Sequence, residues 1–471
     1  MKALILILSL ILFLSINTSP EDEKVQSLPD YSFPAQIYSG YLNVSAVKKF
    51  HYLFNLAQED PQNKPLALWL NDGPGCSSLD GWANEHGPMF LDELGNFHLN
   101  DYTWTKEANI IYLESPGDVG FSYIDSNETE DLFIDPNTTA SDNLKALLDF
   151  FEKFPEWRSN DFYVTGESYG GIYVPILAYH ILEYNKGAEE SKKIKLRGIQ
   201  VGNGVGDWTF DHKAATMDYV FTHHLISYET RLEYNEHCLI EKTFNQEKCD
   251  AIKKEISDFL DGINIYDYLR ECKVPKKLKG VHDKHSKYYQ YAPWAFDWKT
   301  ETEEGKINLE DTNESNDDDG SQVTPCFDDS NIEEYFNRKD VQQALHVTPK
   351  RTWYVCSSAV YDRFQHGKEG SVWAYPILIE AGLKILLYSG DTDVIVPYSG
   401  NQLWIKNLGL EIEDPWRQWR AFDEKDFVSG YVVKYKGLTF CTIRGTGHMA
   451  PMWKRKEAFY VFSKFLKGQD L

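Results

Sequence analysis

This sequence of 471 residues has few basic residues for its length and lacks long apolar runs. Its 48 Lys and Arg stand against 72 Asp and Glu, so the formal net charge is −24. Nucleic acids are bound through clustered positive charge, so the shortage of Lys and Arg argues against a nucleic-acid partner. No segment offers the roughly 20 consecutive apolar residues of a transmembrane helix. We therefore expect a soluble chain that binds neither nucleic acid nor a membrane.

The longest apolar stretch, residues 3–16, is too short to span a bilayer. It follows Met1-Lys2 and gives way to a polar stretch, which is typical of a secretory signal peptide over residues 1–19. We therefore expect the secretory pathway, with a lysosome, a vacuole or the exterior as the destination. Of the five Asn-x-Ser/Thr sequons, the one at Asn17 lies too near the cleavage point to matter. The expected glycosylation sites are Asn43, Asn127, Asn137 and Asn313.

Cysteine is sparse, and no CxxC pair occurs, which argues against a zinc ribbon. In a secreted chain, seven cysteines suggest three disulfides and one free thiol. The count does not determine how the cysteines pair.

Short runs rich in β-branched and aromatic residues predict buried strands, and longer periodic segments between and after them predict helices. Strands that alternate with helices indicate an α/β fold with a mostly parallel sheet covered on both faces. Ligands of such sheets bind beyond the carboxyl ends of the strands. The predicted strands are residues 66–70, 109–113, 162–165, 194–201 and 384–388, and the predicted helices are 140–154, 173–184 and 454–465.

The pattern changes between residues 208 and 331, where charged helical stretches precede a long polar segment. We interpret this region as an insertion, or cap subdomain, with a solvated acidic loop at about residues 300–320. The α/β core is then expected in two segments, 20–207 and 332–471, on either side of the cap over 208–331.

The motif that carries chemistry is Gly166-Glu167-Ser168-Tyr169-Gly170, a G-x-S-x-G between a predicted strand and a predicted helix. A sharp strand-to-helix turn needs small residues around the serine and exposes its hydroxyl to the site. Ser168 is thus the candidate nucleophile.

An acid and a base should follow the nucleophile in the order Ser, Asp or Glu, His. Asp393 follows the strand at 384–388, and His448 lies in a Gly-flanked turn after a strand near the C-terminus. We choose Asp393 over Asp391 because Asp391 is better placed to form the turn. The Gly-Pro loop after the strand at 66–70 predicts an oxyanion hole made by the amides of Gly73 and Tyr169.

These motifs resemble those of the serine carboxypeptidases of the α/β-hydrolase fold. The resemblance covers nearly the whole mature chain and rests on residues 38–42, 69–78, 114–120, 166–171, 202–204, 341–346 and 445–451. It implies the release of single amino acids from peptide and protein C-termini at acidic pH, through an acyl-enzyme on Ser168. No metal or organic cofactor is implied.

The resemblance also implies that Asn71, Glu85 and Glu167 bind the α-carboxylate of the substrate. Two acids can hold a carboxylate only when protons lie between them, so binding should fade as the pH rises. One departure from the family pattern is Asp72, where a glycine is usual. An extra carboxylate there would repel the substrate carboxylate and favour a cationic C-terminal side chain.

The cystine pairs implied by the resemblance are Cys76–Cys356, Cys238–Cys249 and Cys272–Cys326. Cys441 is then left as a buried, inert thiol.

Three other functions compete with the peptidase. An acyltransferase would use the same triad, but Asn71 and Glu167 favour a substrate with a free carboxylate. A noncatalytic secreted binding protein would not need Ser168, Asp393 and His448. A metallocarboxypeptidase has an incomplete set of candidate ligands, namely His180, Glu183, His282 and His285. The sequence does not distinguish a monomer from a homodimer.

Overall fold

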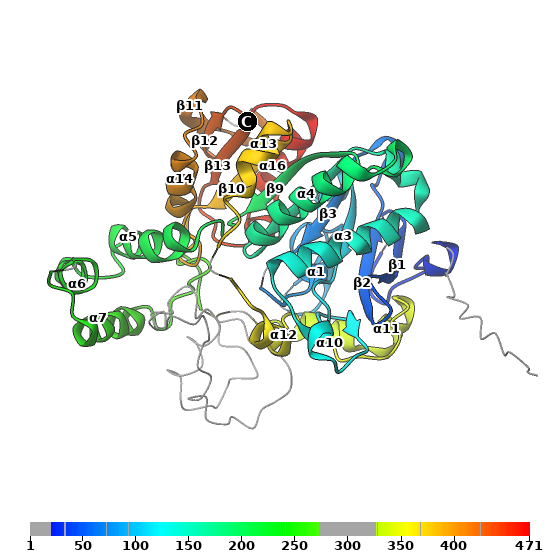
Figure 1. Ribbon diagram of the computed structural model, residues 1–471, viewed down its shortest axis with the longest axis horizontal. Coiled ribbons are helices and arrows are strands. Elements are labelled where there is room, and N and C mark those ends of the chain that lie inside the picture. The colour runs from blue at the N-terminus through cyan, green and yellow to red at the C-terminus, as the bar shows by residue number, and fades with distance from the viewer. Residues whose placement is uncertain are drawn as a thin grey trace, which may run out of the picture.

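The structure is a computed structural model that describes residues 20–471 except 33, 72, 93, 241, 273–325, 327, 368 and 424. In this part of the chain, eleven strands form one sheet in the order β1-β2-β6-β3-β8-β9-β10-β13-β12-β11, with β7 beside β2 (Figure 1). The strands are β1 Ile37–Asn43, β2 Lys48–Asn55, β3 Leu66–Leu70, β6 Asn109–Leu113, β7 Tyr123–Ile124, β8 Phe162–Glu167, β9 Leu196–Gly202, β10 Lys384–Gly390, β11 Ile412–Trp419, β12 Gly430–Tyr435 and β13 Leu438–Ile443. A separate hairpin is formed by β4 Met89–Leu91 and β5 Phe97–Leu99.

The central strands from β6 to β13 pair in parallel, whereas the strands at both edges pair antiparallel. The predicted mostly parallel sheet is therefore confirmed. All five predicted strands are present as β3, β6, β8, β9 and β10. The strand predicted at 162–165 continues to Glu167, and the one predicted at 384–388 continues to Gly390.

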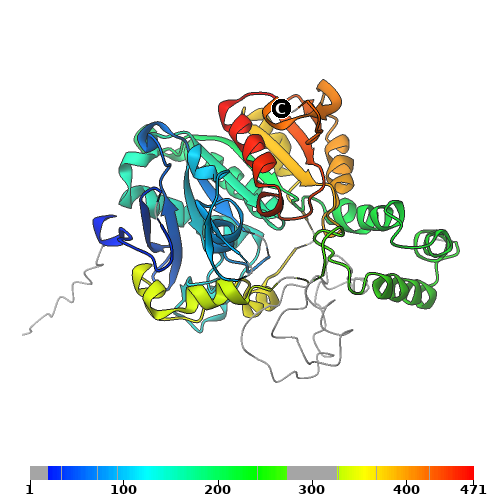
Figure 2. The same ribbon diagram turned by 180° about the vertical axis from the view of Figure 1, so that it is seen from behind.

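Helices cover both faces of the sheet. Figure 1 shows α3, α4 and α13 on the near face, and Figure 2 shows α16 on the opposite face. The helices are α1 Ser78–Asp80, α2 Thr129–Leu132, α3 Pro136–Lys153, α4 Gly170–Gly187, α5 Ala215–Thr222, α6 Tyr228–Tyr234, α7 Gln246–Phe259, α10 Ser330–Asn337, α11 Lys339–Ala344, α12 Ser358–Arg363, α13 Ala374–Glu380, α14 Tyr398–Asn407, α15 Ala450–Trp453 and α16 Arg455–Lys467. The three predicted helices correspond to α3, α4 and α16.

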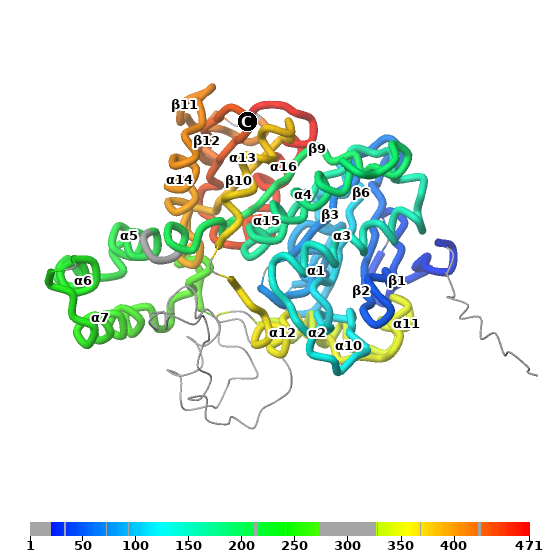
Figure 3. Tube along the Cα trace, in the orientation of Figure 1, coloured from blue at the N-terminus to red at the C-terminus, as the bar shows by residue number. Residues whose placement is uncertain are grey.

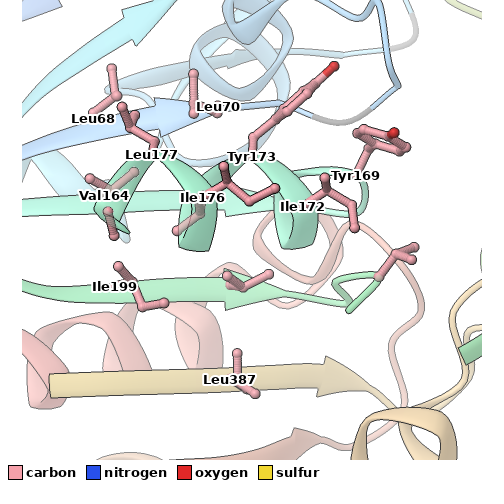
Figure 4. Close-up of a cluster of buried hydrophobic side chains, with 14 of the residues drawn as sticks. Leu68, Leu70, Val164, Tyr169, Ile172, Tyr173, Ile176, Leu177, Ile199 and Leu387 are labelled. Atoms are coloured by element: carbon pink, nitrogen blue, oxygen red, sulfur yellow. The ribbon is translucent and has the colours of Figure 1, made fainter. Parts of the chain in front are cut away.

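Two hydrophobic cores result because successive side chains of a strand point to opposite faces. In β3, Leu66, Leu68 and Leu70 pack on the side of α3 and α4, whereas Ala67 and Trp69 pack on the side of α16. Figure 4 shows side chains of β3, β8, β9 and β10 gathered with those of α4. Burial on both faces fixes the register of these strands. The register in turn sets the relative positions of the loops that follow the strands, where the candidate site lies.

The described residues of the predicted cap contain α5, α6 and α7, which project away from the sheet (Figure 3). The acidic loop lies outside the described residues, as do the predicted signal peptide and Asn313. The division into core and cap stays a prediction. In the described residues, no helix is long and apolar enough to cross a membrane.

Candidate active site

The predicted nucleophile Ser168 lies in the turn between β8 and α4. Its φ is 57°, in the left-handed region that residues with a side chain rarely adopt, and the residue is buried. A Cβ on Gly166 would lie 2.6 Å from the carbonyl oxygen of Leu70, and one on Gly170 would lie 3.2 Å from the same oxygen. The two flanking glycines therefore let the turn pack closely against the end of β3, as a nucleophile elbow requires.

The register of four parallel strands brings the loops of the site together. Leu70 of β3 pairs with Gly166 of β8, and Glu167 pairs with Gly202 of β9. Gly202 also pairs with Tyr388 of β10. The strands thus end side by side, and the chain that leaves them carries Asn71, Ser168, Asn203 and Asp393.

The predicted acid and base are paired directly. His448 Nδ1 lies 2.6 Å from Asp393 Oδ2, and both side chains are fully buried. The backbone amide of Ile395 donates to the other oxygen of Asp393 at 2.8 Å. Asp391 instead accepts a hydrogen bond from the amide of Gly445 at 2.6 Å, so it fixes the turn that carries the histidine. Of the two aspartates, Asp393 is therefore the one that contacts the imidazole.

Asn203 is a site residue whose role the sequence did not predict. Its Nδ2 donates to Asp393 Oδ2 at 2.8 Å, and its Oδ1 accepts from the amide of Gly390 at 2.9 Å. The residue is buried with φ 39°, a conformation that asparagine tolerates better than most residues. The only sequence signal for Asn203 is the Gly-Asn-Gly motif at the end of β9. This motif supports the family resemblance but does not indicate what Asn203 does.

A segment of the predicted cap, residues 265–268, holds the loops of both the acid and the base. The backbone amide of His448 donates to the carbonyl of Tyr266 at 2.7 Å. The hydroxyl of Thr392 donates to Asp267 Oδ1 at 2.6 Å. The sequence did not predict these contacts, and no local signal marks them because they join distant parts of the chain.

The amides of Gly73 and Tyr169 are both available as donors. Gly73 has a φ of 124°, and Tyr169 immediately precedes α4. Neither amide donates a hydrogen bond to another group in the described part of the chain. The N-terminus of an 18-residue helix also favours negative charge at this point. Asp72 lies outside the described residues, so its effect stays a prediction.

Asn71 is held with its amide nitrogen available. Its Oδ1 accepts from the indole nitrogen of Trp69 at 2.6 Å and from the amide of Gly81 at 3.2 Å. These two bonds orient the side chain, and its Nδ2 makes no hydrogen bond with the described residues. The orientation suits the donation of a hydrogen bond to a carboxylate.

Glu85 and Glu167 are both buried and lie near the same tyrosine. Burial raises the pKa of Tyr388 well above its usual range, and the negative charges of Glu167 and Glu85 add to the effect. Glu85 also lies near Arg455, whose pKa burial lowers to about 10 against the opposing effect of the Glu85 charge. Arg455, which no sequence motif indicated, donates to the carbonyl of Asn84 at 2.8 Å. The site therefore gathers two carboxyl groups and one cation close to the elbow.

The alternative metal ligands are not assembled in the described residues, where no group of three or more His, Cys, Asp or Glu side chains could hold an ion. Glu183 on α4 instead pairs with Lys186 at 2.5 Å, and burial lowers the pKa of His180. His282 and His285 lie outside the described residues.

Three disulfides join the cysteines in the pairs that the resemblance implies: Cys76–Cys356, Cys238–Cys249 and Cys272–Cys326. Cys441 is a buried free thiol, and burial raises its pKa. Of the predicted glycosylation sites, Asn43, Asn127 and Asn137 are exposed.

A mostly parallel sheet with an elbow serine after β8 and a carboxylate–imidazole pair on later loops defines the chain as an α/β-hydrolase. A solved structure of similar fold is Kex1(Δ)p, a prohormone-processing carboxypeptidase from Saccharomyces cerevisiae. The TM-score is 0.73 at 20% identity, with 96% of each chain covered.

Sequence comparisons identify the family within this class. The serine carboxypeptidase family model matches residues 29–468. Serine carboxypeptidase 1 of Hordeum vulgare is 34% identical over 489 residues, which cover 96% of this chain and 94% of that protein. Serine carboxypeptidase 24 of Arabidopsis thaliana is 35% identical over 478 residues, which cover 98% and 95%. The chain belongs to the serine carboxypeptidase family and is a serine-type carboxypeptidase.

Proposed function

We propose that this enzyme releases single amino acids from the C-termini of peptides and proteins at acidic pH, through an acyl-enzyme on Ser168. The observation that carries the proposal is the buried pair of His448 and Asp393, 2.6 Å apart, at the same end of the sheet as the elbow serine. A secretory route to a lysosome, a vacuole or the exterior is included in the same proposal.

In the first half of the reaction, Ser168 Oγ attacks the last peptide carbonyl while His448 takes the hydroxyl proton. The negative oxygen of the tetrahedral intermediate is stabilised by the amides of Gly73 and Tyr169. The carbon–nitrogen bond then breaks, and the proton passes from His448 to the nitrogen of the leaving amino acid. Asp393 keeps the imidazole in the required tautomer and stabilises its charged form.

In the second half, His448 removes a proton from water, and the resulting hydroxide attacks the ester on Ser168. Collapse of the second intermediate breaks the ester bond and returns the proton to Ser168. The new carboxylate leaves as the shortened peptide, and the enzyme is restored.

The substrate carboxylate is proposed to meet the Asn71 amide and the carboxyls of Glu85 and Glu167. A carboxylate beside two buried carboxyls is repelled unless protons lie between them. Binding should therefore be tight at acidic pH and should weaken as the protons leave. This dependence is the most specific consequence of the proposed site.

The test compares an N-blocked dipeptide with its C-terminal amide between pH 4 and 8. For the acid we expect KM to rise at least about 10-fold across this range, because losing a charge-assisted hydrogen bond costs about 1.5–3 kcal/mol. The amide should bind weakly at every pH. Glu167→Gln cannot ionise and should flatten the rise in KM, whereas Ser168→Ala, the control, should abolish turnover.

Equal turnover of the acid and the amide would rule out the carboxylate site, and turnover by Ser168→Ala would rule out the nucleophile. An alcohol acceptor in the same assay tests the acyltransferase alternative. If ester rather than free acid is the main product, the second step is acyl transfer and not hydrolysis.

A further inference from the structure

A pocket of about 290 Å³ lies beside the proposed oxyanion loop and contains two arginines. It is lined by Asp118, Gly120, Arg351, Thr352, Tyr354, Ser357, Ala359 and Arg363. None of these residues belongs to the proposed triad, the oxyanion hole or the carboxylate site.

The two arginines share a single acidic partner. Arg363 Nη2 lies 2.9 Å from Asp118 Oδ2, and Arg351 Nη1 lies 3.4 Å from Asp118 Oδ1. Asp118 also accepts a hydrogen bond from the backbone amide of Ile124 at 3.1 Å. The guanidinium of Arg351 lies over the ring of Tyr123, 5.2 Å from its centroid. These contacts hold both cations in place and leave one net positive charge among the charged groups that line the pocket.

Donors remain unused on both arginines. The Nε atoms of Arg351 and Arg363 are buried and have no hydrogen-bond partner in the described part of the chain. A buried donor without an acceptor costs about 1–3 kcal/mol or more. The two side chains are 33% and 30% exposed, so an incoming anion can reach the outer part of each guanidinium, whose planar fork matches the two oxygens of a carboxylate.

The pocket is joined to the proposed oxyanion loop by short connections. The amide of Ser357, which lines the pocket, donates to the carbonyl of Gly75 at 2.9 Å. Phe364, directly after Arg363, packs against Tyr169 with 5.3 Å between ring centroids. The leaving amino acid would occupy the separate carboxylate site at Asn71. The pocket can therefore accept only substrate residues that lie N-terminal to the peptide bond that is cut.

We propose that Arg351 and Arg363 form a subsite for an acidic side chain of the substrate, upstream of the C-terminal residue that is released. The inference rests on the proposed peptidase function. Free small anions share the carboxylate chemistry, and a competition experiment separates the two sources.

The test uses N-blocked peptides that carry either Glu or Gln, one position at a time, at the three residues before the C-terminal one. At pH 5, we expect kcat/KM at one position to be at least about 10-fold higher for Glu, since hydrogen bonds to charged groups contribute about 1.5–3 kcal/mol. Arg363→Gln and Arg351→Gln should each reduce this Glu-to-Gln ratio several-fold. The control Lys350→Gln removes an exposed charge next to Arg351 and should keep the ratio.

A ratio near one at all three positions in the wild-type enzyme would overturn the subsite, whatever the variants do. So would a ratio that persists in both arginine variants. Below about pH 4 the glutamate side chain is protonated, so the ratio should fall there. Failure of the wild-type enzyme to cut any of these peptides would instead count against the proposed peptidase function.

A binding measurement keeps the subsite testable without turnover. Ser168→Ala should bind the preferred Glu peptide about 10-fold more tightly than its Gln counterpart, and adding Arg363→Gln should reduce the difference several-fold. Equal affinities would overturn the proposal. If Arg363→Gln weakens the binding of inorganic phosphate but leaves the Glu-to-Gln affinity ratio unchanged, the pocket binds free anions and the assignment to a substrate side chain is wrong.

Discussion

At the scale of single residues, Asn203 connects the strand ends of the site to the proposed catalytic acid. The side chain of Asn203 donates to Asp393 and accepts from the amide of Gly390, so it joins the loop after β9 to β10 and to the loop that follows it. It does not touch the reacting atoms, and its proposed role is to position Asp393 toward His448.

The variant Asn203→Ala removes the donor to the carboxylate of Asp393. We expect kcat to fall about 10- to 100-fold with little change in KM, because losing a hydrogen bond to a buried charge costs about 1.5–3 kcal/mol. Without that donor the carboxylate holds the proton on His448 more firmly. The acid limb of the kcat/KM profile should therefore move to higher pH.

The pH–rate profiles of wild type and Asn203→Ala would test this role. A lower kcat with an unchanged acid limb would mean that Asn203 only supports the local fold. Asn203→Ser, which can still donate, should recover some of the loss.

The sequence predicted the residues whose chemistry is tied to a local motif. Ser168 lies in a G-x-S-x-G, and Asp393 and His448 follow in the order that this fold requires. Asn203 and Tyr266 act through hydrogen bonds to residues more than a hundred positions away in the chain, and no local pattern reports such contacts. Their roles become visible only when the register of the strands is known.

At the scale of secondary-structure elements, the elbow depends on the close approach of β3 to the start of α4. The carbonyl oxygen of Leu70 would lie 2.6 Å from a Cβ on Gly166 and 3.2 Å from one on Gly170. The sequence predicted both elements and the turn, but it could not say which neighbour forces a glycine there, because that neighbour is a strand from another region of the chain.

Of two Gly→Ala variants in this unit, only Gly166→Ala should destabilise the protein. In Gly166→Ala the new methyl would lie 2.6 Å from the Leu70 oxygen and 2.9 Å from Val174 Cγ2, so β3 or α4 must move. Overpacking of this kind costs about 1–3 kcal/mol. The matched control is Gly187→Ala at the end of α4, where nothing lies within 4 Å of the added Cβ. That change should be neutral or should stabilise the protein by up to about 1 kcal/mol.

Urea unfolding monitored by circular dichroism would give both free energies of unfolding. Equal stabilities for the two variants would contradict the packing argument. We also expect Gly166→Ala to lower kcat, since any shift of the elbow moves Ser168, whereas Gly187→Ala should leave kcat unchanged.

At the scale of the whole molecule, the fold encloses a titratable imidazole, that of His366, beside Tyr169 of the proposed oxyanion hole. His366 lies among Tyr169, Trp208, Tyr361 and Phe364, with ring centroids 5.3–6.2 Å from its own. Its Nδ1 is buried without a hydrogen-bond partner in the described part of the chain. Burial lowers the pKa of His366 to about 4, so the folded protein keeps this imidazole neutral under mildly acidic conditions.

This pKa shift predicts a loss of stability on the acidic side. Above pH 6.5 the imidazole is neutral in both the folded and the unfolded chain, and it adds no pH dependence. Between about pH 6.5 and 4 the unfolded chain binds a proton that the folded chain does not, so the free energy of unfolding falls as the pH falls. The loss levels off below the folded pKa. At pH 4.5 it should reach about 2–3 kcal/mol, at 1.36 kcal/mol for each pKa unit.

His366→Phe keeps an aromatic ring in the cluster and removes the titration. We therefore compare the free energy of unfolding of this variant with that of the wild type at each pH. The variant's advantage over the wild type should be about 2–3 kcal/mol larger at pH 4.5 than at pH 7.5. The control His224→Asn changes an exposed histidine at a positive φ that asparagine tolerates, and it should follow the wild-type curve at both pH values. Urea unfolding at the two pH values measures all three proteins. Parallel curves for wild type and His366→Phe would mean that the imidazole becomes protonated in the folded state near its ordinary pKa, and that the aromatic cluster admits the charge.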